Sequence, residues 1–168
     1  MSSDRIMAEE PIEKKITRIL IHRKMTVTAA ESCTGGLVAG TLVNADGISE
    51  VFKESYVTYS NEAKHKLLGV KKETLEKYGA VSRQTAAEMA EGAVRAAGAD
   101  ASVVTTGVAG PGGGTEEKPV GLVYIGCCVK GCTIVKRCFY GGDRQGGRHS
   151  AVKEAVEILY CQLLADKY

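Results

Sequence analysis

The chain has 168 residues, of which 44% are hydrophobic and 25% charged, and its formal net charge is +2. This length suffices for one domain whose hydrophobic core needs neither a metal nor a disulfide. The small net charge argues against broad nucleic-acid binding, which requires a concentrated basic surface. The first ten residues, MSSDRIMAEE, do not have the basic and apolar segments of a signal peptide, and no apolar run is as long as a membrane span. We therefore expect one cytoplasmic domain over 1–168, with 1–9 as a flexible tail, and no membrane or nucleic-acid partner.

The six cysteines and three histidines do not form a metal-binding pattern. No two cysteines are spaced as a CxxC pair, and four of the six lie in segments that resemble strands. Without an export signal, reduced thiols that fill space in the core are the expected state. The histidines, at 22, 65 and 149, are not spaced as zinc ligands. We expect no metal and no other cofactor.

Hydrophobic periodicity and capping residues predict a chain in which helices and strands alternate. Apolar residues at helical spacing indicate six helices. They lie at about 10–23, at 37–44, after Asn61 as an N-cap, at about 72–78, from Ser82 to Ala97, and at 152–163. Alternating or continuous apolar runs indicate strands at 25–30, 55–60, 101–107, 120–129 and 132–140. Lys130 and Gly131 form a strong two-residue hairpin signal between the last two strands.

Alternation of helices and strands followed by one hairpin is typical of a mixed, mostly parallel sheet with helices on both faces. In such α/β folds, ligands bind beyond the carboxyl ends of the strands. Three polar or glycine-rich segments, 31–36, 59–64 and 106–114, each follow a strand. We therefore expect these three segments to lie at one edge of the sheet.

Two of these segments carry residues with chemical potential. Ser32 lies in a strand-to-helix turn, where its hydroxyl and the following N–H groups would face a ligand. Ser32 or Thr34 would equally serve as the N-cap of the next helix. With Asn61 as a cap, Lys64 is the third helical residue, where a cation opposes the helix dipole. That position favours a function for Lys64, although an exposed surface lysine remains the alternative.

Two further features suit a phosphate group. The segment 107–114 is not a Walker motif, because no Gly-Lys-Ser/Thr closes it. Gly107, Gly110 and Gly112 to Gly114 can expose N–H groups to a phosphate, or can simply form a mobile turn. Arg144 and Arg148 lie four residues apart and share a face if the last helix begins this early. A pair of guanidinium groups suits phosphate, and solvated surface arginines are the alternative.

Six motifs occur in the order that characterises the CinA C-terminal domain family, which the chain resembles over about residues 10–165. The motifs are AESCTGG at 30–36, VTYSNEAK at 57–64, GAVS at 79–82, TGVAGP at 106–111, EKPVG at 117–121 and GDR at 142–144. The resemblance implies a three-layer α/β/α sandwich around a mixed sheet. It also implies hydrolysis of nicotinamide mononucleotide to nicotinate mononucleotide and ammonia, without a metal. A non-catalytic nucleotide-sensing module linked to competence or DNA damage is the alternative function.

The resemblance also implies roles for individual residues. It implies a catalytic set of one serine, one lysine and one tyrosine. The lysine is Lys64 and the tyrosine is Tyr59. The family position that matches Ser49 is the expected nucleophile, with Ser32 assisting or binding substrate. The residues expected to bind the nucleotide substrate are Thr34, Gly35, Asn61, Thr106, Gly107, Gly110, Arg144 and Arg148. A domain of this kind is also expected to form a homo-oligomer.

Overall fold

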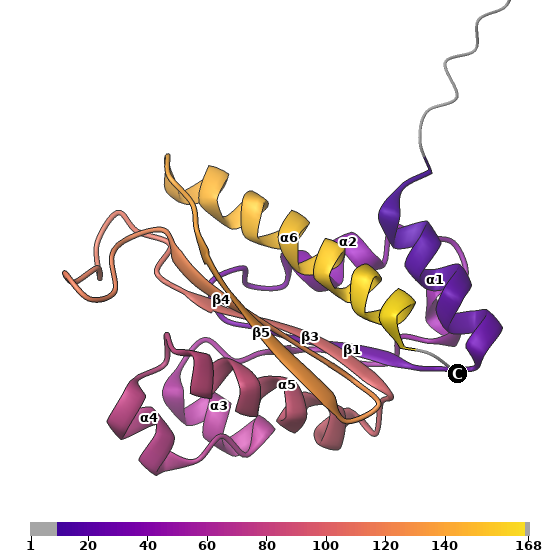
Figure 1. Ribbon diagram of the computed structural model, residues 1–168, viewed down its shortest axis with the longest axis horizontal. Coiled ribbons are helices and arrows are strands. Elements are labelled where there is room, and N and C mark those ends of the chain that lie inside the picture. The colour runs from indigo at the N-terminus through magenta and orange to yellow at the C-terminus, as the bar shows by residue number, and fades with distance from the viewer. Residues whose placement is uncertain (1–9, 167–168) are drawn as a thin grey trace, which may run out of the picture.

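The chain folds into three layers, with one sheet between two layers of helices (Figure 1). The computed structural model describes residues 10–166, so the tail expected at 1–9 lies outside the described residues. The helices are α1 (Ile12–Arg23), α2 (Leu37–Leu42), α3 (Asn61–Leu68), α4 (Lys72–Tyr78), α5 (Arg83–Ala97) and α6 (Arg144–Ala165), with the short 3-10 helix η1 (Ile48–Glu50). The strands are β1 (Val27–Glu31), β2 (Tyr56–Val57), β3 (Ala101–Gly107), β4 (Leu122–Val129) and β5 (Cys132–Phe139).

The sheet has the strand order β2-β1-β3-β4-β5 and is mixed, as expected. Strands β2, β1 and β3 pair in parallel, whereas the pairs β3–β4 and β4–β5 are antiparallel. Only β4 therefore runs against the common direction. Lys130 and Gly131 close the predicted hairpin, and both have positive φ, 47° and 80°. This backbone geometry matches the right-handed twist of the two strands.

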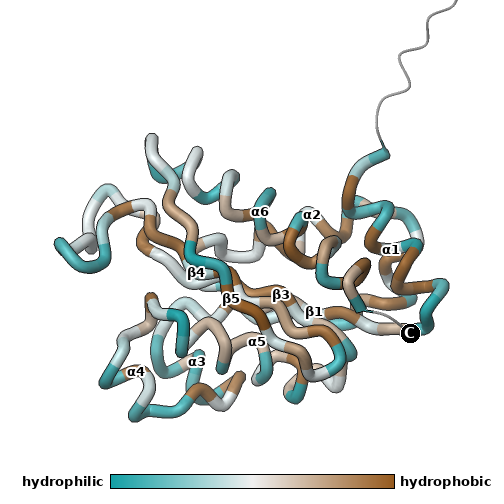
Figure 2. Tube along the Cα trace, viewed as in Figure 1, coloured by the Kyte–Doolittle hydropathy of each residue, from teal (hydrophilic) through white to brown (hydrophobic). Residues whose placement is uncertain are grey.

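Helices α1, α2 and α6 cover one face of the sheet, and α3, α4 and α5 cover the other (Figure 1). Every residue of β1 is buried, as are the first six of β3, so both faces of these two central strands are covered. Figure 2 shows the same apolar centre between two layers of mixed hydropathy. Gly92 allows α5 to approach α3, because an added Cβ would lie 1.9 Å from the Leu68 carbonyl oxygen.

Two element boundaries differ from the sequence predictions. The strand expected over 55–60 is only Tyr56–Val57, because its partner β1 ends at Glu31, which pairs with Val57. The cap of α3 is Ser60 rather than Asn61, since the Ser60 hydroxyl accepts a hydrogen bond from the Ala63 N–H at 3.0 Å. Lys64 is therefore the fourth helical residue, not the third.

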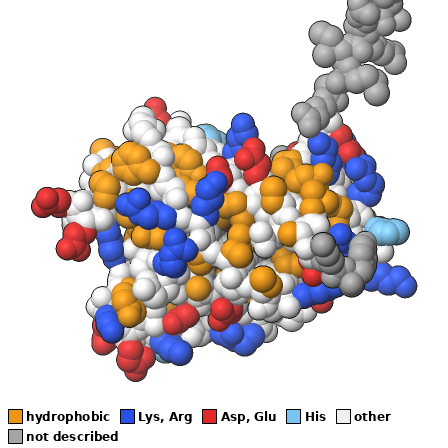
Figure 3. Space-filling view, viewed as in Figure 1, with side chains coloured by type: hydrophobic (Ala, Val, Ile, Leu, Met, Phe, Trp, Pro, Cys, Tyr) orange, Lys and Arg blue, Asp and Glu red, His pale blue; other side chains and the backbone are white. Residues whose placement is uncertain are grey.

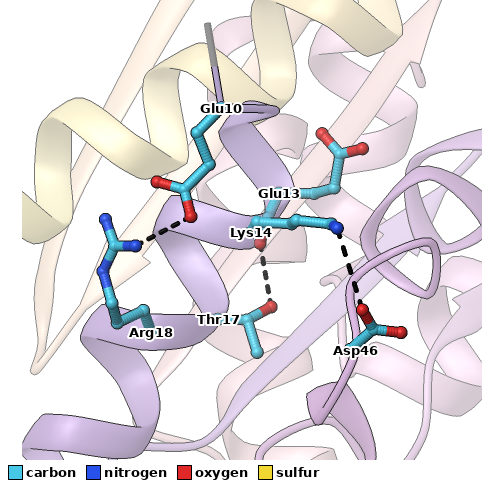
Figure 4. Close-up of polar contacts among 6 residues, drawn as sticks. All are labelled: Glu10, Glu13, Lys14, Thr17, Arg18 and Asp46. Atoms are coloured by element: carbon cyan, nitrogen blue, oxygen red, sulfur yellow. Dashed lines mark hydrogen bonds and ion pairs between the residues drawn. The ribbon is translucent and has the colours of Figure 1, made fainter. Parts of the chain in front are cut away.

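The outer surface mixes charged and apolar side chains (Figure 3). Four of the cysteines (33, 127, 128 and 138) are buried, as expected of core thiols, whereas Cys132 and Cys161 are exposed. On α1, exposed ion pairs join Arg18 to Glu10 and Lys14 to Asp46 (Figure 4). Such exposed pairs contribute little to stability. Among residues 10–166, no helix combines the length and apolar character needed to cross a membrane.

Candidate active site

A pocket of about 310 Å³ opens where β1, β2 and β3 end. Segments that are far apart in the sequence line it, as the rule for ligand sites in α/β sheets predicts. Its lining residues are Ser32, Cys33, Tyr59, Lys64, Ala80, Val81, Thr106, Gly107, Val108, Ala109, Gly110, Gly112, Gly113 and Arg144. The three segments expected at one edge of the sheet thus meet in a single pocket.

Lys64 is the most unusual residue of this pocket, because its side chain is only 1% exposed. Its Nζ atom donates hydrogen bonds to the Thr58 carbonyl oxygen at 2.8 Å and to Ser32 Oγ at 3.1 Å. Burial disfavours the charged ammonium and lowers the pKa of Lys64 to about 8. The alternative of an exposed surface lysine is therefore wrong. Lys64 therefore reaches its neutral, proton-accepting form at a much lower pH than an ordinary lysine.

The turn that carries Ser32 is held by the buried carboxylate of Glu31. Its oxygen atoms accept hydrogen bonds from the Thr34 hydroxyl and from the N–H groups of Gly36, Val38 and Ala39, at 2.5–3.1 Å. Helix α2 has no capping side chain at its own N-cap, Gly36, so Glu31 satisfies its first N–H groups from the preceding strand. Neither Ser32 nor Thr34 caps the helix, which leaves the Ser32 hydroxyl to Lys64.

Arg144 joins two walls of the pocket from the first residue of α6. Its guanidinium donates to the Gly110 carbonyl oxygen at 2.7 Å and to Tyr59 Oη at 3.2 Å. The Asp143 carboxylate caps α6 by accepting from the Gly146 N–H at 2.6 Å, and this cap fixes where the helix begins. Tyr59 follows β2 and is 61% exposed, so its ring stands at the mouth of the pocket.

Thr106, Gly107 and Gly110 lie in the pocket as predicted. The Thr106 hydroxyl donates to the Ala80 carbonyl oxygen at 2.8 Å, so its proton is committed and its oxygen is left to accept. The two glycines also have a packing role. An added Cβ would lie 2.7 Å from the Leu122 carbonyl oxygen at Gly107 and 2.3 Å from Val120 at Gly110.

Ser49, the nucleophile expected from the family resemblance, does not lie with Lys64. It is exposed in η1 and is not among the residues that line the pocket. The chain after η1 meets the start of β1, where the Val27 N–H donates to the Val51 carbonyl oxygen. Ser32 follows the other end of β1, about 16 Å away at 3.3 Å per residue. The predicted pairing of Ser49 with Lys64 is therefore wrong, and Ser32 occupies that position.

Four of the expected substrate-binding residues also lie elsewhere. Thr34 is fully buried behind the turn, bonded to Glu31 and to the Thr105 hydroxyl. Gly35 is exposed with φ +58°, and Asn61 is an exposed residue of α3; neither lines the pocket. Arg148 shares a face of α6 with Arg144, but it donates to backbone carbonyls of the serine turn instead of facing the pocket.

Sequence reasoning missed three residues that shape this site. Glu31 is the one charged residue of the buried strand β1, and a carboxylate at that position was the available signal. The Thr58 carbonyl holds Lys64, but no sequence pattern identifies a backbone acceptor. Cys33 lines the pocket directly after Ser32, and burial raises the pKa of its thiol to about 11. The Cys33 thiol is therefore protonated at neutral pH, which leaves the serine as the better candidate nucleophile.

Comparisons with known proteins agree on one family. The CinA C-terminal domain matches residues 9–163. A protein of Clostridium novyi, named as a competence-damage inducible protein, is 56% identical over 156 residues, which are 93% of this chain and 38% of that protein. A protein of the same name from Clostridium acetobutylicum is 55% identical over 158 residues, 94% of this chain and 38% of its own length. The chain thus spans 38% of the length of these curated relatives.

Solved structures match the chain over nearly its full length. The competence/damage inducible protein CihA from Agrobacterium tumefaciens has a TM-score of 0.82 and 43% identity, covering 90% of this chain and 95% of that one. The competence damage-inducible protein A (ComA) from Klebsiella pneumoniae has a TM-score of 0.89 and 35% identity, covering 93% of this chain and 97% of that one. These similarities confirm the α/β fold expected from the sequence.

Proposed function

Because the chain belongs to the CinA C-terminal domain family, we propose that its pocket hydrolyses the carboxamide of nicotinamide mononucleotide, with Ser32 as nucleophile and Lys64 as base. One observation carries this proposal: a buried lysine with a pKa lowered to about 8 donates to a serine hydroxyl at 3.1 Å inside a pocket. A nucleophile within hydrogen-bond reach of its base is the arrangement that covalent catalysis requires.

The first chemical step is attack of Ser32 on the amide carbon. A neutral lysine has one lone pair and two N–H groups, so Lys64 can donate to the Thr58 carbonyl while it accepts the Ser32 proton. The serine oxygen forms a bond to the amide carbon, and the carbonyl oxygen becomes an oxyanion. The pyridinium ring of the substrate assists twice, because it withdraws electrons from this carbonyl and disfavours the charged lysine.

Backbone N–H groups next to Ser32 are the candidates to stabilise the oxyanion. Within residues 10–166, the N–H groups of Cys33 and Thr34 donate to no backbone carbonyl, whereas the Gly35 N–H donates to the Ser32 carbonyl. One such donor in an enzyme site is typically worth about 3 kcal/mol of transition-state stabilisation. Tyr59 can then protonate the departing amide nitrogen as the C–N bond breaks, because Arg144 donates to its oxygen and leaves the phenol proton free. Water attacks the acyl-serine and gives its proton to the Tyr59 phenolate, the acid is released, and Lys64 returns its proton to the Ser32 oxygen.

The remaining lining residues suit a mononucleotide. The cavity of about 310 Å³ is at the lower end of the range for small-molecule sites. Among its lining residues are the cationic Arg144 and no carboxylate, which favours an anionic ligand such as a phosphate monoester. The small apolar side chains of the pocket provide contacts for a flat ring. The Thr106 oxygen, as an acceptor, suits a ribose hydroxyl or the carboxamide NH₂.

The decisive experiment is ammonia release from nicotinamide mononucleotide by the purified protein in the presence of a metal chelator. Turnover that follows the substrate concentration and is lost in Ser32→Ala supports the proposal. Activity that disappears in chelator and returns with zinc or manganese would contradict a serine–lysine mechanism. Tight binding of the mononucleotide without any ammonia release would instead favour the non-catalytic sensing module.

A further inference from the structure

Arg148 contacts the turn that carries Ser32, from a position outside the pocket. Its Nε atom donates to the Cys33 carbonyl oxygen at 2.8 Å, and its Nη2 atom donates to the Thr34 carbonyl oxygen at 3.0 Å. Arg148 is half-buried, and an added Cβ at Gly35 would lie 3.4 Å from Nη2, so the turn passes close to the guanidinium. Two consecutive carbonyl groups are thus held by one planar cation, with the geometry that suits an arginine fork.

This contact has a consequence on the opposite side of the same peptide groups. In a trans peptide the C=O and the N–H point in opposite directions. The Cys33 carbonyl shares its peptide plane with the Thr34 N–H, so the guanidinium fixes that N–H facing away from α6. Within residues 10–166, the Thr34 N–H donates to no backbone carbonyl. A charged donor on the carbonyl also polarises the peptide group and makes its N–H a stronger donor.

We propose that Arg148 is a positioning residue that orients the Ser32 turn and its free N–H group for the oxyanion. This inference rests on the proposed function of Ser32 as a nucleophile. The alternative expected from the sequence, that Arg148 binds the phosphate beside Arg144, disagrees with its two backbone contacts. Arg148 acts through the peptide groups and does not touch the substrate.

Arg144, four residues earlier on the same helix, provides the matched comparison. It lines the pocket, whereas Arg148 does not. Arg148→Ala should lower kcat for nicotinamide mononucleotide about 100-fold, the usual effect of losing one oxyanion donor, with KM within about threefold of its normal value. Arg144→Ala should act mainly on KM. Arg148→Lys should lie between Arg148→Ala and the unmodified protein, because an ammonium keeps the charge but does not have the planar fork that matches the two carbonyl groups.

The pH profile separates a positioning role from a general loss of structure. Arg148 contacts the carbonyl groups and not Lys64, so the pKa seen in kcat/KM should be the same in Arg148→Lys as in the unmodified protein. A thermal unfolding curve recorded beside each assay identifies any variant that is unfolded at the assay temperature. If Arg148→Ala is unfolded, Arg148→Lys carries the test.

A second measurement does not depend on the substrate. Phenylmethanesulfonyl fluoride should label Ser32: the serine oxygen forms a bond to sulfur, fluoride leaves, and the proton passes to Lys64. Intact-mass analysis with peptide mapping gives the labelling rate, which Arg148→Ala and Arg148→Lys should both reduce. If the unmodified protein is labelled but releases no ammonia from the mononucleotide, the proposed function fails while a reduced rate in the variants still supports the role of Arg148.

Three results would overturn the inference. One is an increase of KM in Arg148→Ala as large as that in Arg144→Ala, which would make Arg148 a substrate ligand. Another is normal turnover and labelling in a folded Arg148→Ala or Arg148→Lys protein. The third is the absence of Ser32 labelling in the unmodified protein, because the turn would then present no reactive serine.

Discussion

Lys64 is held by Thr58, whose backbone carbonyl accepts a hydrogen bond from Lys64 Nζ at 2.8 Å. Thr58 itself is placed by the sheet, because its N–H donates to the Glu31 carbonyl oxygen at 2.8 Å. The next residue along the chain from Glu31 is Ser32, so the lysine and the serine are positioned from the same pair of strands. Their separation of 3.1 Å therefore depends on the sheet and not on two flexible surface side chains.

This arrangement predicts which serine matters. Ser32→Ala should lower kcat/KM for nicotinamide mononucleotide by at least about 10³-fold, because it removes the attacking atom. Lys64→Met should have a similar effect, and the double variant should lose little more, since residues that act as one unit are strongly non-additive. Steady-state ammonia release measures all three variants.

Ser49→Ala is the control for this prediction, because Ser49 is an exposed serine outside the pocket. Its turnover should remain within about threefold of normal, as expected for a surface substitution. A Ser49→Ala protein without activity, beside an active Ser32→Ala protein, would return the nucleophile to Ser49 and contradict the geometry described above.

The pH dependence of turnover follows from the state of Lys64. A lysine base must be neutral, and burial lowers the pKa of Lys64 to about 8, so kcat/KM should rise as the pH increases through 8. At pH 6 the value should be about 100-fold below its plateau, because the neutral fraction falls tenfold per pH unit. Rates with free nicotinamide should show the same rise, since that compound has no phosphate that titrates. A flat profile between pH 6 and pH 9 would exclude Lys64 as the base.

The sequence predicted the central strands and the hairpin because their residues are constrained locally. Strand β3 was predicted at 101–107 and observed at Ala101–Gly107, since a strand buried on both faces needs an apolar run. The strand predicted at 55–60 was too long, because its length is set by the end of β1 and not by its own residues. The local sequence pattern determines where a strand can form, whereas the neighbouring strand determines how many residues pair.

The site was predictable only in part, for the same reason. The rule that ligands bind at the carboxyl ends of strands grouped Ser32, Lys64 and Thr106 correctly. The expected position of Ser49 beside Lys64 was wrong, because the sequence does not show that the chain after η1 returns to the start of β1. The spacing of Arg144 and Arg148 correctly placed them on one face of a helix. It did not reveal that the serine turn passes beside the second arginine.

Lys64 should also make the free energy of unfolding depend on pH. A buried lysine with a pKa near 8, against about 10.4 in the unfolded chain, binds its proton less well when folded. Between these two values the unfolded state binds more protons, so the contribution of Lys64 to the free energy of unfolding rises with pH. From pH 7 to pH 10, the unmodified protein should gain about 2 kcal/mol relative to Lys64→Met. Urea unfolding at both pH values measures this difference.

The matched control for stability is Lys66→Met, because Lys66 is an exposed lysine of the same helix. The difference in free energy of unfolding between Lys66→Met and the unmodified protein should be the same at pH 7 and at pH 10. A Lys64→Met protein that shows no such pH trend would mean that Lys64 is not desolvated in the folded state.

Arg144 is the residue of the pocket that we expect to bind the substrate phosphate. Arg144 contacts both Tyr59 and Gly110 of the glycine-rich segment 107–114, and we expect this side of the pocket to bind the phosphate. Free nicotinamide, which has no phosphate, should therefore be a far poorer substrate than the mononucleotide. Arg144→Ala should narrow this gap by reducing kcat/KM for the mononucleotide about 10- to 100-fold, the usual cost of one charged hydrogen-bonded contact. Arg137→Ala, which removes an exposed arginine of β5 outside the pocket, is the control for net charge and should leave both rates nearly unchanged. Equal rates on the two compounds in the unmodified protein would mean that segment 107–114 and Arg144 do not bind the phosphate. The segment would then be only a turn that Arg144 holds in place.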